Sequence, residues 1–411
     1  MIGTRFAIMT HLRLIDWVLV SCAGLVPLIA VFAHKGSVIL LSVAGGLALV
    51  TAVTNGHLKA IFTQRLAILF AAGLIWLVAA TMISPDPASG FLKIAKICML
   101  GILFAALAWQ LRSLPEKVKT AAIVSQAWGT MAALVVLAGG YLAIGVFGQQ
   151  LVEIEREPEI SVLYPGIVTS ALLLPGVLGY LRKSRRIGMM WGAAVGAILL
   201  SLAVGSMTVT VLVAVTLGLF MAFRDNPWYL PRLLALVLVV VTVTLPVSMP
   251  LVLDRVAVAF VENGNPDGEG GKTVAGSTEH RYLIWRFAAD RAAERPFLGW
   301  GFNASRSLPG GHELTGERAE LLPLHPHNAV LQVWLELGVP GLLLLCVVLW
   351  RTYMPPGWEN FPRRELLIRT LTVTAVFIAA SATFGIWQSW WLATIALALA
   401  STSLWHEGAE A

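Results

Sequence analysis

Residues 324–345, LHPHNAVLQVWLELGVPGLLLL, decide how this chain folds. Two histidines flank a proline, and an asparagine then precedes an apolar run long enough to cross a bilayer. Pro326 favours an extended conformation at His325, and Asn328 is a good N-cap for the helix that follows. We therefore predict a membrane-spanning helix that begins just after Asn328, with His327 at its N-terminal end.

Three polar residues recur every four positions along this helix, namely Asn328, Gln332 and Glu336. Polar side chains in a bilayer are costly unless they face other helices or a water-filled cavity. The stripe is therefore predicted to face the interior of a helical bundle, beneath His327. Two interpretations of His327 stay open, a reactive group above this stripe or a residue that merely ends the helix.

Composition places the whole chain among all-α polytopic membrane proteins. Of its 411 residues, 57% are hydrophobic and 13% are charged, too few charges to cover a soluble protein of this size. The net charge of +6 comes from short loops, which indicates membrane topology and not nucleic-acid binding. About twelve spans are predicted, at 14–33, 36–54, 66–83, 91–111, 120–146, 163–181, 187–204, 206–223, 233–253, 329–350, 367–385 and 387–405.

Basic residues gather in alternate loops, for example at 182–186, so those loops are predicted to be cytoplasmic. Both termini then lie in the cytoplasm. The chain divides into nine spans over residues 1–253, a large periplasmic loop over 254–328, and three spans with a cytoplasmic C-terminus over 329–411.

The large loop is predicted to contain an amphipathic helix over 277–296, STEHRYLIWRFAADRAAERP, at the membrane surface. Ser277 or Thr278 would cap it, and Arg286 and Asp290 would form a pair one turn apart. Its apolar stripe comprises Tyr282, Trp285, Ala289 and Ala292. A loop that carries its own helix is more often functional than connective.

Several cations on the predicted periplasmic side are suited to binding phosphate. Arg281 opens the loop helix, and Arg156 lies among four glutamates, which could instead pair with it. Lys93 and Lys96 stand one turn apart where basic residues are unexpected, so an anionic lipid headgroup or snorkelling to the surface would explain them. Weaker candidates are Arg255 and Arg286.

A zinc site is an alternative interpretation of the histidines. His325 and His327 are spaced as a ligand pair, and His280 and His312 lie in the same loop. However, no third ligand follows at a characteristic spacing and no Cys supports the site. We therefore predict no metal.

The order of three motifs resembles the O-antigen ligase and O-antigen polymerase superfamily of bacterial inner-membrane proteins. These motifs are STEHRYLIW at 277–285, PFLGWG at 296–301 and HPHNAVLQVWLELGVPGLLL at 325–344. The resemblance implies a GT-C-like glycosyltransferase without metal or other cofactor. It would move a glycan from an undecaprenyl-diphosphate-linked O-antigen donor to the lipid A-core of lipopolysaccharide, at the periplasmic face of the inner membrane, among membrane lipids.

The resemblance also implies residue roles. His327 would be the general base and Arg281 would hold the diphosphate, with His325, Asn328 and Trp285 beside them. Many members carry an arginine where this chain has Met207. The missing cation would then come from another basic residue, with Arg156, Lys93 and Lys96 as candidates.

Three other functions stay open at this stage. A protein-targeted O-oligosaccharyltransferase and an O-antigen polymerase would share the loop motifs. A transporter or flippase would instead place charged residues or broken helices at mid-membrane, whereas the polar groups here gather at one end of the spans. The identity of the glycan and of the accepting sugar does not follow from the residues.

Overall fold

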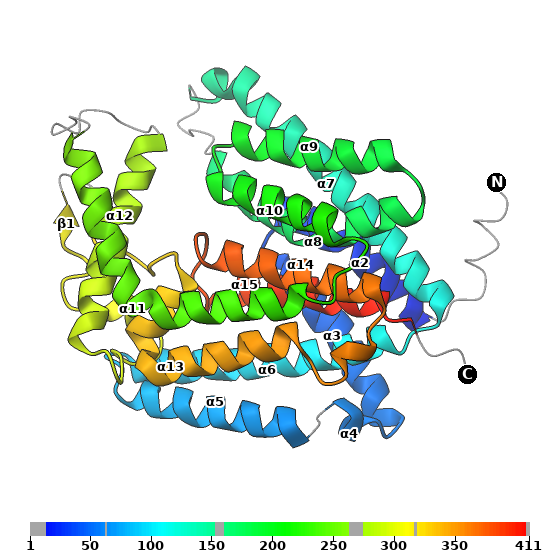
Figure 1. Cartoon of the computed structure of the whole chain (residues 1–411), viewed down its shortest axis with the longest axis horizontal. Coiled ribbons are helices and arrows are strands. Elements are labelled where there is room, and N and C mark those ends of the chain that lie inside the picture. Colours follow the sequence, from blue (N-terminus) through cyan, green and yellow to red (C-terminus); the bar gives the residue numbers. More distant parts are fainter. Residues whose placement is uncertain (1–13, 62–63, 153–159, 263–273, 316–318, 408–411) are drawn as a thin grey trace.

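The computed structural model describes residues 14–61, 64–152, 160–262, 274–315 and 319–407. Most helices run side by side, and α12 lies across one end of the bundle (Figure 1). We call that end the loop end, since it also carries residues 295–315 and 319–328. The opposite end, where α2 begins and α6 ends, is called the terminal end (Figure 1).

Several consecutive helices are joined by short turns, whereas a long segment over residues 295–328 separates α12 from α13. The helices are α2 (Leu14–Phe32), α3 (Gly36–Thr54), α4 (Leu58–Ile61), α5 (Gln64–Met82), α6 (Pro87–Arg112), α7 (Glu116–Val152), α8 (Tyr164–Lys183), α9 (Ile187–Ala203), α10 (Met207–Phe223), α11 (Leu230–Glu262), α12 (Val274–Glu294), α13 (Ala329–Tyr353), α14 (Arg363–Ala380) and α15 (Ser389–Ser401). The minor elements are η2 (Ile160–Leu163), η3 (Ala304–Ser307), η4 (Trp358–Asn360), η5 (Thr402–Trp405) and a hairpin of β1 (Leu314–Thr315) and β2 (Ala319–Glu320).

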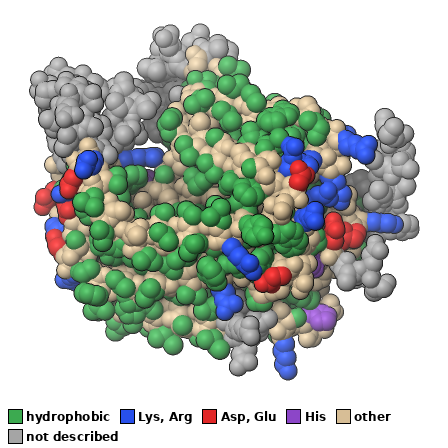
Figure 2. All heavy atoms as spheres, viewed as in Figure 1, with side chains coloured by type: hydrophobic (Ala, Val, Ile, Leu, Met, Phe, Trp, Pro, Cys, Tyr) green, Lys and Arg blue, Asp and Glu red, His purple; other side chains and the backbone are tan. Residues whose placement is uncertain are grey.

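The protein is an all-helical, multi-pass membrane protein. Within the described residues, seven helices are long and apolar enough to cross a bilayer, and four shorter helices are also apolar. Each of the twelve predicted windows overlaps one helix, although the windows 367–385 and 387–405 extend beyond α14 and α15, and twelve full crossings remain a prediction. In Figure 2 apolar side chains cover the middle of the visible face, whereas charged groups gather mostly toward the two ends.

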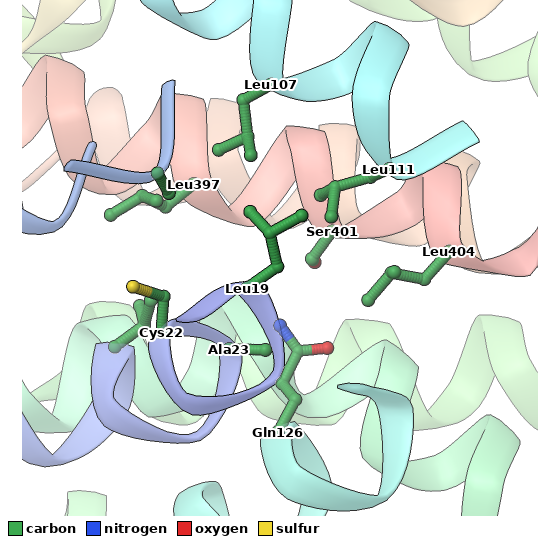
Figure 3. A pocket seen from close by; sticks show the side chains of 11 residues that line it. Leu19, Cys22, Ala23, Leu107, Leu111, Gln126, Leu397, Ser401 and Leu404 are labelled. Carbon is green, nitrogen blue, oxygen red and sulfur yellow. The ribbon is translucent and has the colours of Figure 1, made fainter. Parts of the chain in front are cut away.

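Small residues let the helices approach closely. A Cβ atom on Gly129 of α7 would lie only 2.1 Å from the carbonyl oxygen of Gly24 on α2. Such close contacts hold helices together in a bilayer, where burial of apolar surface gives little drive to associate. A cavity of about 30 Å³ remains between α2, α3, α6, α7 and α15 toward the terminal end, with the amide of Gln126 among its apolar walls (Figure 3).

The loop helix exists but begins earlier than predicted. Helix α12 starts at Val274, so Ser277 and Thr278 lie inside it and the predicted N-cap is wrong. The pair of Arg286 and Asp290 is confirmed, with Nε and Oδ2 3.2 Å apart. The buried face of α12 comprises Ile284, Ala288, Ala289 and Ala292.

Helix α13 is broken at Gly338, where the sequence analysis predicted one continuous span. Gly338 has φ 63° and ψ −159°, and Pro340 has no N–H to donate to Glu336. The carbonyls of Leu335 and Glu336 therefore lose their helical donors. They accept instead from the backbone N–H groups of Trp300 and Gly301, at 2.8 and 3.0 Å.

Two further backbone groups next to the break also find hydrogen-bond partners outside α13. The N–H of Val339 donates to the carbonyl of Pro296 at 3.1 Å, and the indole of Trp76 donates to the carbonyl of Leu337 at 3.2 Å. The PFLGWG segment thus satisfies the backbone groups that the break in ELGVPG exposes. We call this backbone pairing of 296–301 with 335–339 the clasp.

A substitution at Gly299 tests whether the clasp stabilises the protein. Gly299 has φ +70°, and a Cβ atom there would lie 2.6 Å from the backbone carbonyl of Glu336. We expect Gly299→Ala to lower the thermal unfolding temperature in detergent by several degrees, because the added methyl forces the two segments apart. Gly46→Ala is the control, since a Cβ there meets nothing within 4 Å. Equal unfolding temperatures for the two variants would show that the clasp contributes no stability.

Candidate active site at the loop end

His327 lies between α12 and the turn that joins α14 to α15. Its Nδ1 is 2.5 Å from the carbonyl oxygen of Thr383, so Nδ1 carries the proton and donates it. Its other nitrogen, Nε2, has no hydrogen-bond partner among the described residues. A neutral imidazole with a bare Nε2 is the form that can accept a proton.

The surroundings of His327 keep it neutral. Burial lowers its pKa, the bond to Thr383 partly opposes this, and the nearby charges of Arg281 and His280 lower it further. Its backbone has φ +54°, a left-handed conformation that is uncommon for residues other than glycine. Such conformations persist only where neighbouring contacts impose them.

His325 supplies one of those contacts. It is 5% exposed, and its Nδ1 accepts the backbone N–H of His327 at 3.3 Å. Its Nε2 lies 3.2 Å from the backbone nitrogen of Gly385 and 2.9 Å from the side-chain amide of Gln388. Burial, His327 and Arg306 lower the pKa of His325 to about 3. His325 is therefore neutral at physiological pH and packs against His327, with the two ring centroids 4.2 Å apart.

Arg281 and Trp285 approach the histidines from α12. The Nη1 of Arg281 donates to the carbonyl of Ala382 at 3.0 Å, and the indole of Trp285 donates to the carbonyl of Pro326 at 2.8 Å. Burial lowers the pKa of Arg281, but a guanidinium stays charged at any physiological pH. Its charge lies close enough to His327 to affect that residue.

The turn at residues 381–388 was missed by the sequence analysis. Its carbonyls bind Arg281 and His327, and its N–H groups and Gln388 bind His325 and Gln332. Residues 367–385 and 387–405 were predicted as two continuous spans, but the chain is non-helical between Ala380 and Ser389. Gly385 and Gln388, two interruptions in a long apolar run, were the signals that could have revealed it.

The polar stripe on α13 is buried, as predicted, and it fixes the turn in place. Asn328 caps the helix by accepting the N–H of Leu331 at 3.0 Å. Gln332 donates to Glu336 at 3.0 Å and accepts the N–H of Ile386 at 3.1 Å. Both residues therefore have structural partners within this site.

Glu336 is the deepest residue of the stripe and is fully buried. Its carboxylate accepts four hydrogen bonds, from the N–H of Asn303 (2.7 Å), the hydroxyl of Ser305 (2.5 Å), the amide of Gln332 (3.0 Å) and the indole of Trp387 (2.7 Å). These donors come from the loop, from α13 and from the 381–388 turn. Four donors compensate much of the cost of burying a carboxylate.

A second group of cations lies within electrostatic reach of one another, and Arg306, one of them, also affects His325. Lys93 is half-buried on α6, within electrostatic reach of Arg306, Lys96 and Glu336. Arg306 lies on η3 and was not singled out from the sequence. Among the described residues, Lys93, Lys96 and the guanidinium of Arg306 have no ion pair.

Three further predicted residues contribute no described contact to this site. Arg156 lies outside the described residues. Arg255 is exposed on α11, and Arg286 is paired with Asp254 and Asp290, so its charge is already balanced.

The structure does not assemble the histidines as a set of zinc ligands. His280 contacts the carbonyl of Glu320, and His312 contacts the side chain of Glu320 and the carbonyl of Arg306. Within the described part of the chain, no three His, Cys, Asp or Glu side chains are grouped to hold a metal.

Known proteins are similar to the part of the chain that contains this site. A family model described as "O-Antigen ligase" matches residues 189–346. A Rickettsia conorii protein named "Putative polysaccharide ligase" is 36% identical over 123 residues, which is 29% of each chain. A Rickettsia bellii protein of the same name is 34% identical over 140 residues, or 32% of this chain and 33% of that protein.

The resemblance to the O-antigen ligase family is confirmed. The family match runs from α9 to α13 and includes the clasp, Arg281, Arg306 and His327, whereas Lys93 and Lys96 lie outside it. The matched stretches span a third or less of the Rickettsia proteins' own length.

Glu336→Gln tests whether the four donors need a carboxylate. An amide offers one acceptor oxygen, so its NH₂ group would face at least one donor, and we expect a loss of roughly 1–3 kcal/mol of unfolding free energy. Trp387→Phe, which removes one donor and leaves the carboxylate, should cost less. Thermal unfolding in detergent measures both, and a Glu336→Gln protein as stable as the wild type would contradict this view of the site.

Proposed function

We propose that the protein is an O-antigen ligase, a metal-independent glycosyltransferase. It transfers a glycan from undecaprenyl diphosphate to the lipid A-core of lipopolysaccharide. The observation that carries this proposal is a neutral, half-buried His327 with a bare Nε2 and with Arg281 within electrostatic reach. The match to the O-antigen ligase family and the relatives' names as polysaccharide ligases support it.

In the proposed reaction, a hydroxyl of the acceptor sugar attacks the anomeric carbon of the donor glycan. The new C–O bond forms as the bond from that carbon to the diphosphate oxygen breaks, and the diphosphate leaves with the electron pair. His327 takes the hydroxyl proton on Nε2, and Thr383 holds the protonated Nδ1 in place. Arg281 stabilises the negative charge of the departing diphosphate. The activated leaving group removes the need for a paired acid.

The same proposal places the loop end on the periplasmic face of a bacterial inner membrane, with twelve spans and both termini in the cytoplasm. The clusters of basic residues in the turns at the terminal end favour this orientation. An O-antigen polymerase or a protein-targeted transferase would use the same base and cation with another acceptor. A transporter is less favoured, because the non-helical turn at 381–388 contacts a base and a cation at the loop end.

His327→Ala tests the general base. We expect it to abolish transfer, since no other described histidine combines a bare nitrogen with this position. The assay uses purified protein with lipid-linked donor and lipid A-core, and thermal unfolding checks the fold. His312→Ala is the control, an exposed histidine of the same loop that should retain activity. Turnover near wild type in His327→Ala would exclude this base.

Arg281→Gln tests the diphosphate contact and its coupling to the base. Turnover should fall by roughly 10²-fold, because a charge that stabilises the leaving group is removed. Wild-type activity should fall only as the pH drops through the lowered pKa of His327, below 6.5. Loss of the Arg281 charge raises that pKa, so the acidic limb of the variant's pH–rate profile should move to higher pH.

Arg281→Lys should restore the position of the acidic limb but only part of the turnover, because an ammonium lacks the bidentate fork. An acidic limb unchanged in Arg281→Gln would show that Arg281 does not act on His327. Full turnover in the same variant would remove Arg281 from the reaction.

A further inference from the structure

A second set of cations lies where segment 303–306, which contains Arg306, meets the first turns of α6. The side-chain amide of Asn303 donates to the hydroxyl of Ser89, in the first turn of α6, at 3.1 Å. Lys93 and Lys96 follow Ser89 by four and seven residues, so all three lie on one face of α6. That face is turned toward the loop segment, and Arg306 lies three residues after Asn303.

This group holds more positive charges than acids. Glu336 is within electrostatic reach of Lys93, and this one carboxylate can balance at most one of the three cations. The backbone carbonyl of Arg306 binds His312. Its guanidinium is exposed and has no partner among the described residues. Positive groups that are held close together and outnumber the acids within reach indicate a site for an anion.

The position of Lys96 indicates what kind of molecule carries that anion. Lys96 is exposed about 14 Å along α6 from Pro87, at 1.5 Å per residue. Leu92 and Met99, one turn before and after it, are also exposed and apolar. A charged side chain on such a surface is costly unless it meets an anionic headgroup or reaches the interface.

We propose that Lys93, Lys96 and Arg306 bind a phosphate group carried by a membrane lipid, in addition to the diphosphate contact at Arg281. The cations run from the lipid-facing side of α6 to His325, whereas Arg281 approaches His327 from α12. A lipid entering from the bilayer could place its phosphate on this set and its sugar headgroup above the two histidines.

Two lipids of the reaction carry phosphate, the diphosphate-linked donor and the phosphorylated glycolipid acceptor. Assignment of the site to one of them rests on the proposed function, whereas phosphate binding does not. The test therefore has a binding arm that needs no transfer and a kinetic arm that separates the two lipids.

The binding arm uses purified full-length protein in detergent, with short-chain phosphatidic acid as the phosphate probe and phosphatidylcholine as its zwitterionic counterpart. The double variant Lys93→Gln/Arg306→Gln should bind phosphatidic acid about tenfold or more weakly, because two charge-assisted contacts are lost. Lys93→Arg and Arg306→Lys should retain most of the affinity. Lys35→Gln is the matched control, an exposed lysine without an ion pair in the loop-end turn between α2 and α3.

Equal weakening in the Lys35 control, or unchanged phosphatidic acid affinity in the double variant, would overturn the site. In the kinetic arm, a raised KM for the acceptor assigns the phosphate to the acceptor, and a raised KM for the donor assigns it to the donor. Unchanged KM for both lipids would overturn a role in transfer. If the wild type shows no transfer at all, the proposed function fails while the binding arm still decides the site.

Discussion

The loop end depends on the break in α13 at Gly338. A transmembrane helix that breaks in this way leaves carbonyls and an N–H without partners, and a bilayer offers no water to satisfy them. Here the indole of Trp76 satisfies the carbonyl of Leu337, and the backbone of residues 296–301 satisfies the carbonyls of Leu335 and Glu336 and the N–H of Val339. Because the contacts of residues 296–301 are made by backbone atoms, they fix the loop segment in register with α13 independently of its side chains, except where a Cβ would collide, as at Gly299.

Glu336 connects the clasp to a third segment, the turn at residues 381–388. Its backbone carbonyl belongs to the clasp, and its carboxylate binds Asn303 and Ser305 on one side and Trp387 on the other. The turn at 381–388 is thereby placed where its carbonyls can receive Arg281 and His327. Preorganised groups of this kind are what a site needs to stabilise charge without rearrangement during the reaction.

Apolar runs predicted the helices well, because the bilayer allows few alternatives to a helix. The inward polar stripe also followed from residue type and spacing, whereas the grouping of His327 with Arg281 followed from the resemblance to the O-antigen ligase and O-antigen polymerase superfamily. The break at Gly338 was not predicted, although Gly338 and Pro340 stand in the quoted motif, because its stability depends on a segment forty residues away. Arg306 was missed for the same reason, since its neighbour Lys93 lies on α6, far away in the sequence.

Cations beside a histidine have two opposite effects on the proposed reaction. Positive charge favours the departure of a diphosphate, but it also lowers the pKa of a base that lies within its reach. A base of lowered pKa is weaker, yet it is unprotonated over a wider pH range. For a substrate with an activated leaving group, the availability of the base matters more than its strength. The contact of His327 with a backbone carbonyl, and not with a carboxylate, is consistent with this balance, because an acid at Thr383 would raise the pKa again and pair with Arg281.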